Sequence, residues 1–444
     1  MKETTIPNQF EKTFSEFEKI SSKIDPEWVK SIRKESLLIA NSLGLPTARR
    51  GNEEWKYTDI KALNKTLFSD FSTYNIDDKP IEINYKNLED DSLHEKIVFK
   101  DGICISKTFQ KDSYVSNILN DNDISPENSN QLRNYLAKLT ILDENFFAAL
   151  NTTFFSFGAL IYIPDNTNIT KPIHLSIESS SQSEGNVANP RILVVLGKNS
   201  NATLIEEYLS FTNTKYLNNA VIEIIIGENS NLNHYRMQNE SIESYAITNT
   251  TVWIESYAHY ESTVTDIGGS LVRNNLNVIT KQEGASAKLN GIYIVDEKQH
   301  IDNQVIIDHA MPNTNSRELY KGILSGHSRS VFHGSIIVRE GAYKVDANQA
   351  DKNLLLSDNA EADTKPAFWV YCDDVKCGHG AACGKIDESA IFYLQSRGIP
   401  EIQARSMLIY AFANEIIKDI KDEFIREYIE SFVQYKLEKL IEIR

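Results

Sequence analysis

The sequence has few of the features that mark disulfide-stabilised, nucleic-acid-binding or membrane-spanning proteins. Four cysteines among 444 residues are too few for a disulfide framework in so large a chain. The formal net charge of -16 argues against a nucleic-acid binder, because phosphate neutralisation requires clustered lysine and arginine. No run of 18 apolar residues occurs, so we expect no transmembrane helix. The N-terminus lacks the apolar core of a secretory signal. These absences together predict a cytoplasmic protein.

Three nucleotide-binding or catalytic signatures are also missing. The chain has no G-x-x-x-x-G-K-[ST] loop, no G-x-G-x-x-G after a strand and no G-x-S-x-G turn. Without the phosphate-binding loop, the chain is not expected to hydrolyse ATP itself. Its hydrophobic fraction of 41% and charged fraction of 24% are those of an ordinary globular protein.

Three of the four cysteines lie in one segment, YCDDVKCGHGAACG, at 371–384. Cys377 and His379 alternate within it, and Cys372 and Cys383 flank them. Thiolate and imidazole groups are common ligands of soft and borderline metals. The spacing C-x4-C-x-H-x3-C matches no common zinc module, however, and small cysteines also pack in protein interiors much as alanine does. Spacing alone leaves both interpretations open.

Both ends of the chain have helical patterns. Phe10, Phe14 and Phe17 recur at helical spacing, and a second helix is predicted from Asp25-Pro26 to Gly44. With a further helical stretch over 129–151, these patterns predict an N-terminal helical or mixed region over 1–152.

The C-terminal region, 371–444, combines the Cys-x-His motif with two helical patterns. One helix is predicted from Asp387 to near Gly398. Beyond it, one continuous apolar stripe runs from Ile416 to Leu440. That stripe either packs on the protein's own core or docks a partner.

The central region, 153–370, is predicted to be a β-helix core. Short runs rich in Val, Ile, Tyr and Thr alternate with polar turns. One turn pattern recurs as PDNTNI at 164–169, GKNSNA at 197–202 and GENSNL at 227–232. Strand–turn units that repeat over such a length favour a solenoid, whose coils bury one face against the next. The alternative is a β-sandwich or barrel with coincidental asparagine-rich turns.

Four histidines of the β region are candidate metal ligands: His300, His309, His327 and His333. His300 and His309 are nine residues apart, so on one continuous strand their side chains would face opposite sides. A single strand therefore cannot direct both at one ion, and satisfied surface or interface histidines are the default interpretation.

Four carboxylates suggest an alternative function. Asp302, Asp308, Asp346 and Asp351 could supply the paired carboxylates of a stand-alone, carbohydrate-active β-helix enzyme. Such enzymes are generally secreted, which does not fit the N-terminus of this chain.

The segment at 346–399 strongly resembles the SufB/SufD family of iron–sulfur cluster assembly scaffold proteins, and its DDVKCGHGAACGKIDE stretch resembles the SufD branch. RRGNEEWKYTDI at 49–60 and ENFFAALNTTFFSFGALIYIP at 144–164 are also similar to the family. The resemblance implies a mainly β fold with flanking α segments, in which a right-handed parallel β-helix core lies between N-terminal and C-terminal helices.

The resemblance also implies a function. It implies a non-catalytic scaffold subunit of a SufBCD complex, which pairs with a SufB-like paralogue and docks a SufC-like ATPase through its C-terminal helices. Cys377 and His379 match the family's C-x-H motif, so they are expected to contribute to a transient iron–sulfur cluster site shared with SufB. Cys372 and Cys383 lie outside that motif and are expected to be structural. A flavin on the complex is compatible with the resemblance, but no residue of this chain identifies one.

Overall fold

The computed structural model describes residues 7–23, 25–48, 52–61, 63, 95–101, 103–107, 114–119, 125–180 and 185–442. The helical elements are α1 (Pro7–Ser21), α2 (Glu27–Leu43), α4 (Pro126–Tyr135), the 3-10 helix η2 (Leu142–Glu144), α5 (Phe146–Phe154), α6 (Glu388–Ser396), α7 (Glu401–Ile417) and α8 (Glu423–Glu442). The first strands are β1 (Glu95–Lys100), β2 (Ile103–Lys107), β3 (Val115–Asn117), β4 (Gly158–Ile163), β5 (Ile173–Ser179), β6 (Val187–Ala188), β7 (Arg191–Leu196) and β8 (Asn201–Ser210). The others are β9 (Leu217–Ile226), β10 (Asn231–Asn239), β11 (Tyr245–Ile254), β12 (His259–Asp266), β13 (Leu271–Thr280), β14 (Ser286–Val295), β15 (His300–His309), β16 (Asn315–Leu324), β17 (Arg329–Val338), β18 (Val345–Leu355), β19 (Glu361–Val370) and β20 (Val375–Gly384).

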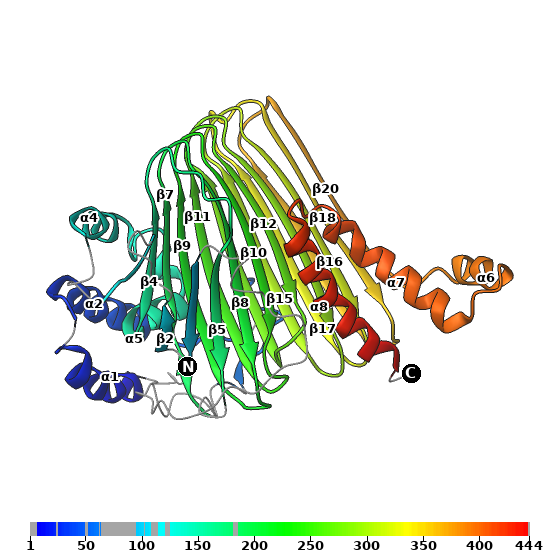
Figure 1. Ribbon diagram of the computed structural model, residues 1–444, viewed down its shortest axis with the longest axis horizontal. Helices are drawn as coiled ribbons and strands as arrows, with labels where there is room; N and C mark the ends of the chain where they lie inside the picture. Colours follow the sequence, from blue (N-terminus) through cyan, green and yellow to red (C-terminus); the bar gives the residue numbers. More distant parts are fainter. Residues whose placement is uncertain are drawn as a thin grey trace.

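The strands form a parallel β-solenoid of about eight turns, which confirms the predicted fold class (Figure 1). Successive strands alternate between two facing sheets. The first sheet has the order β2-β1-β5-β8-β10-β12-β14-β16-β18-β20, and the second has the order β19-β17-β15-β13-β11-β9-β7-β4-β3. The pairs β1–β2 and β3–β4 are antiparallel. The space between the sheets, here called the lumen, is filled by the main hydrophobic cluster, to which both sheets contribute.

The repeated asparagine turns stack at one corner of the solenoid. Asn166, Asn199 and Asn229 all have positive φ, near 55–60°, a conformation that asparagine adopts more readily than most residues. The Asn199 side-chain amide donates to the Asn166 oxygen at 2.9 Å, and that of Asn229 donates to the Asn199 oxygen at 3.3 Å. The predicted turn pattern therefore marks one corner of successive coils, joined by a ladder of side-chain hydrogen bonds.

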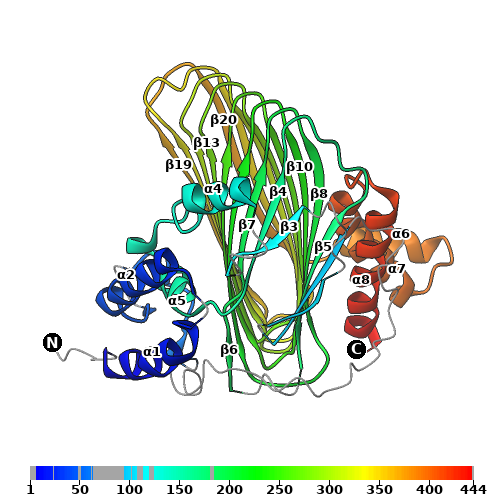
Figure 2. The same cartoon turned by 60° about the vertical axis from the view of Figure 1, so that its left-hand side comes forward.

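Helices cover the outer faces of both sheets (Figure 2). The N-terminal helices pack on the second sheet, where Phe146 and Phe154 of α5 join Leu217 and Ile247 in one cluster. Because the lumen covers the other face, β9 is buried at every position, as is typical of strands in covered parallel sheets. The predicted end of α2 at Gly44 is confirmed, but the N-cap is Pro26 and not Asp25, so the helix begins one residue later than predicted. The single helical stretch predicted over 129–151 is wrong, because α4, η2 and α5 are separate elements.

The C-terminal helices α7 and α8 pack on the outer face of the first sheet (Figure 1). The continuous stripe predicted from Ile416 to Leu440 is wrong in one respect, because a turn at 418–422 divides it between two helices. Its residues Ile416, Tyr428 and Phe432 are buried against strands such as β10 and β14. Within the described residues, no helix is both long enough and apolar enough to cross a membrane.

Candidate functional site

The last coil of the solenoid leaves two strands at the ends of their sheets. In the described chain, β20 has a single strand neighbour, β18, and β19 pairs only with β17. We call this end of the solenoid, formed by β19 and β20, the open end. The division predicted at 370 coincides with the end of β19, but β20, which carries the Cys-x-His motif, is still a strand of the solenoid.

Cys377 and His379 lie on β20 with one residue between them, so both side chains point to the same face of the strand. That face is the lumen side, since Cys377 packs against the lumen cluster. Their Cα atoms are about 6.6 Å apart, from the rise of a parallel strand. The structure therefore brings the two predicted site residues together at the mouth of the lumen.

Cys377 is half-buried, and its environment keeps the thiol protonated. Burial raises the pKa of Cys377, the charge of Asp346 raises it further, and a backbone hydrogen bond with Ala347 opposes them. A metal that binds this sulfur must displace the proton, because only the thiolate ligates.

His379 is exposed and stacks on Phe368 of β19, with ring centroids 4.6 Å apart and an interplanar angle of 20°. The stacking connects the two strands of the open end across the lumen. No spacing in the sequence relates Phe368 to His379, and only the pairing of coils brings the two rings together.

The two other cysteines of the segment differ in position. Cys383 lies on the same face of β20 as His379, but four residues farther along, at about 13 Å by strand rise. Burial and the charge of Asp351 raise its pKa. Cys372 follows β19 and packs against the lumen cluster. In the part of the chain that the structure describes, no three His, Cys, Asp or Glu side chains are grouped to hold a metal ion.

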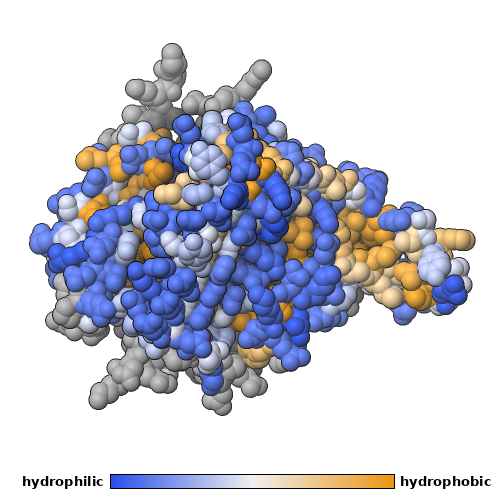
Figure 3. All heavy atoms as spheres, turned by 90° about the horizontal axis from the view of Figure 1, so that it is seen from above, coloured by the Kyte–Doolittle hydropathy of each residue, from blue (hydrophilic) through white to orange (hydrophobic). Residues whose placement is uncertain are grey.

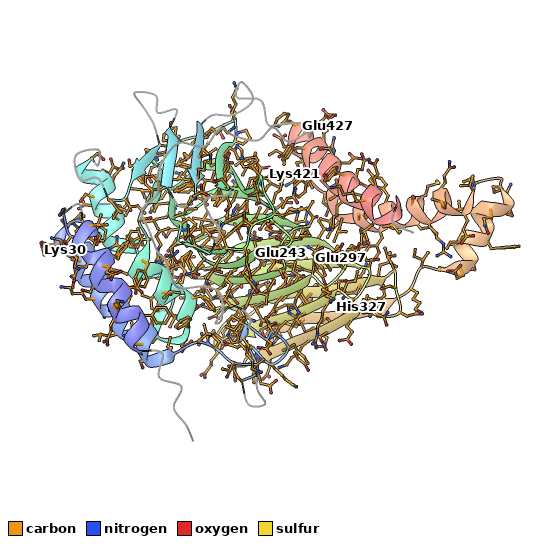
Figure 4. All side chains as sticks on the ribbon, turned by 90° about the horizontal axis from the view of Figure 1, so that it is seen from below. Lys30, Glu243, Glu297, His327, Lys421 and Glu427 are labelled. Atoms are coloured by element: carbon orange, nitrogen blue, oxygen red, sulfur yellow. The ribbon has the colours of Figure 1, made fainter. Side chains whose placement is uncertain are left out.

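Three of the four candidate histidines of the β region contact local side chains, and the fourth is exposed. His300 contacts the Thr58 hydroxyl at 3.0 Å on the outer face, whereas His309 is buried on the lumen side beside Thr314. The predicted opposite orientation is thus confirmed. Burial lowers the pKa of His309 to about 4. His333 lies 3.0 Å from the Gln304 side chain. His327 is exposed on the turn between β16 and β17 (Figure 4).

The four candidate carboxylates do not face one another. Asp302, Asp308 and Asp346 lie on outer faces and pair with Arg273, Arg339 and Arg317, respectively. Asp351 lies in the lumen, where it accepts a hydrogen bond from the Asn353 amide at 2.7 Å. A glycosidase needs two carboxyl groups on either side of one bond, so these residues do not support a carbohydrate-active site.

The described part of the 49–60 segment packs on the outer face of the second sheet. Trp55 is buried, and the Arg273 guanidinium stacks on its ring at 3.8 Å. The Thr58 hydroxyl donates to Asp302 at 2.5 Å. Residues 49–51 lie outside the described residues. The segment therefore joins the N-terminal region to the solenoid.

A second exposed surface lies on α6 and the start of α7, which project from the solenoid (Figure 1). Hydrophobic side chains gather on this projection (Figure 3). Four of them are at least half exposed: Phe392, Tyr393, Ile402 and Met407. Exposed apolar side chains concentrated on one element are typical of a protein interaction site.

Two family models match the chain. One, described as SUF system FeS cluster assembly, SufBD core domain, matches residues 178–412, and another, described as SufBD protein N-terminal region, matches residues 4–175. The chain is 30% identical over 392 residues to an iron-sulfur cluster assembly SufBD family protein of Synechocystis, covering 86% of this chain and 85% of that protein. It is 29% identical over 391 residues to the iron-sulfur cluster assembly protein SufD of Escherichia coli, covering 87% and 88%. With the SufD protein of Bacillus subtilis it shares 23% identity over 452 residues, covering 98% of each chain.

Proposed function

Because the chain belongs to the SufBD family of iron–sulfur cluster assembly proteins, we propose that it is a SufD-like scaffold subunit. In this role it holds part of a nascent cluster and leaves ATP hydrolysis to a partner. The observation that carries the proposal is the position of Cys377 and His379 on the last strand of an open-ended solenoid. We further propose that the subunit works in the cytoplasm.

The proposed cluster site is half of a complete one. A cluster is ordinarily held by four soft ligands, and β20 supplies one thiol and one imidazole at its lumen mouth. Here the cluster is a cargo, and a scaffold must release it. Two ligands from this chain, with the remainder from a second chain, allow both assembly and release.

We propose that β20 pairs with a SufB-like paralogue. A strand edge presents unpaired N–H and C=O groups and is a template for pairing with another chain. β19 contains Pro366, which lacks an N–H, whereas β20 has no proline and a single charged residue, Lys376. The edge of β20 is thus the better one for continuing a sheet into a partner. Such pairing would bring the partner's ligands beside His379.

We propose that the apolar surface of α6 and α7 docks a SufC-like ATPase. The exposed Phe392 and Ile402 supply apolar area, and α7 continues into the segment that is buried on the first sheet. Movement of the ATPase would therefore be transmitted to a helix that is anchored on the solenoid.

The test is anaerobic reconstitution of the complex with iron and sulfide. His379→Ala should lower the cluster yield, measured by absorbance and bound iron, while size-exclusion chromatography with both partners still gives the full complex. His327→Ala is the matched control, because it removes an exposed imidazole from a turn and should leave the yield unchanged. A normal yield for His379→Ala, or a stable cluster on this chain alone, would overturn the proposal.

A further inference from the structure

Three polar side chains lie in a row on the lumen face of the first sheet, and His379 is the last of them. We call this row the ladder. The strand register aligns Glu318 of β16 with Gln349 of β18, and Gln349 with His379 of β20. Aligned residues on neighbouring parallel strands point to the same face, and the strands lie about 4.8 Å apart. Gln349 is therefore the nearest lumen-facing residue behind His379.

The ladder contains buried hydrogen-bonding atoms without partners. The Gln349 amide donates to one Glu318 carboxyl oxygen at 2.9 Å. This leaves the Gln349 carbonyl oxygen and the other Glu318 oxygen buried and unbonded, although the two residues are only 3% and 4% exposed. Most buried polar groups in proteins are bonded, so the Gln349 carbonyl oxygen is an acceptor open to a further donor.

The second sheet, which faces Gln349 across the lumen, leaves room for its side chain at Gly334. A Cβ atom placed on Gly334 of β17 would lie 1.8 Å from the Gln349 amide nitrogen. Only glycine at that position lets the Gln349 side chain extend across the lumen. Burial raises the pKa of Glu318 to about 8, which keeps this carboxyl largely uncharged near neutral pH. The group behind His379 is therefore the Gln349 amide, held by Glu318 and by the space at Gly334, and not a charged side chain.

His379 requires an acceptor if it is to bind metal in one orientation. A ligating histidine ordinarily donates its second ring N–H to a carbonyl or carboxylate, which fixes the tautomer. The His379 ring makes a stacking contact with Phe368 and no hydrogen bond to any other described residue.

We propose that Gln349 is a positioning residue for His379: its carbonyl oxygen accepts the N–H of the ring nitrogen on the lumen side. The other ring nitrogen is then unprotonated and turned to the open end, where the cluster is held. Glu318 fixes the orientation of the Gln349 amide. This inference rests on the proposed role of His379 as a cluster ligand.

The first measurement needs no cluster. In the full chain labelled with 15N-histidine, His379→Ala identifies the His379 signals, and 15N shifts at a pH where the ring is neutral report its tautomer. We expect one tautomer to predominate in the wild type and a mixture in Gln349→Met, which keeps the length of the side chain but removes the acceptor. Gly334→Ala, which displaces Gln349 from the facing sheet, should give the same mixture. Asn348→Leu, on the outer face of β18, is the matched control and should retain the wild-type signals.

The second measurement is the rate at which the reconstituted complex loses its cluster to a chelator. Loss of a supporting acceptor typically weakens metal binding 10–100-fold, so Gln349→Met should release the cluster faster by a comparable factor. Wild-type tautomer and release rate in both Gln349→Met and Gly334→Ala, with folding verified by circular dichroism, would overturn the inference. A normal cluster yield in His379→Ala would instead overturn the proposed function, while the tautomer data would still decide whether Gln349 contacts His379.

Discussion

Glu223 on the outer face of β9 joins the solenoid to the N-terminal region, and its removal should be costly. Both Glu223 and its partner Arg191 are 0% exposed, with 2.6 Å between guanidinium nitrogen and carboxylate oxygen. The same carboxylate accepts the backbone N–H groups of Ala137, Leu139 and Thr140 at 2.8, 2.9 and 3.1 Å. Four donors thus converge on a single buried anion.

Glu223→Gln keeps the shape of the side chain but leaves the Arg191 charge buried without its counter-ion. Breaking a buried ion pair at one partner typically costs about 3–5 kcal/mol, so we expect the free energy of unfolding in urea to fall by about that amount. The matched control is Glu228→Gln, which removes an ion pair with Lys198 that is 45–62% exposed and should cost at most about 1 kcal/mol. The double variant Glu223→Gln with Arg191→Met should recover part of the loss, because it removes the unpaired charge. Equal losses for Glu223→Gln and Glu228→Gln would refute the reasoning.

Two further predictions concern pH and partner docking. Burial raises the pKa of Glu240 to about 7 and that of Glu318 to about 8, so the folded state binds protons more tightly than the unfolded state. Their stabilising contribution is complete below about pH 4.5 and is lost progressively as pH rises from there through the folded-state pKa values of about 7 and about 8. The melting temperature should therefore fall between about pH 4.5 and 8, and less steeply in Glu318→Gln, whereas equal slopes would contradict the assignment. Ile402→Glu and Phe392→Asp replace exposed side chains, so each should change stability by no more than about 0.5 kcal/mol yet weaken binding of the ATPase partner at least tenfold in titration calorimetry. Wild-type affinity in both variants would place the docking surface elsewhere.

In the proposed function, the open end of the solenoid supplies an incomplete ligand set, because Cys377 and His379 are two of the four ligands that a cluster ordinarily takes. The proton on Cys377 is favoured by burial, and the His379 ring is held by stacking on Phe368. If these residues bind a cluster as proposed, binding must overcome both contacts, which favours reversible retention. A scaffold that transfers its cargo benefits from such a balance.

Several features followed from the sequence because their causes are local. The boundaries of α2 follow from Pro26 and Gly44, whose backbone preferences are set by the residue itself. The asparagine turns mark one corner of the solenoid because asparagine tolerates positive φ. The Cys-x-His spacing places both side chains on one face of any strand. The family resemblance read from 346–399 is confirmed by the family models that match most of the chain.

Tertiary structure decided the features that depend on how coils stack. At the same corner, Tyr257 and Lys344 also take positive φ without being asparagine, because the coils on either side impose the turn. The predicted C-terminal stripe is divided into α7 and α8, and residues on both sides of the turn pack on the first sheet. The alignment of Glu318, Gln349 and His379 depends on register across three strands, and a shift of one residue in any intervening turn would send a side chain to the opposite face. The sequence by itself therefore determined the spacing that places Cys377 and His379 on one face of a strand, whereas only the stacking of the coils decided which residues lie behind that face.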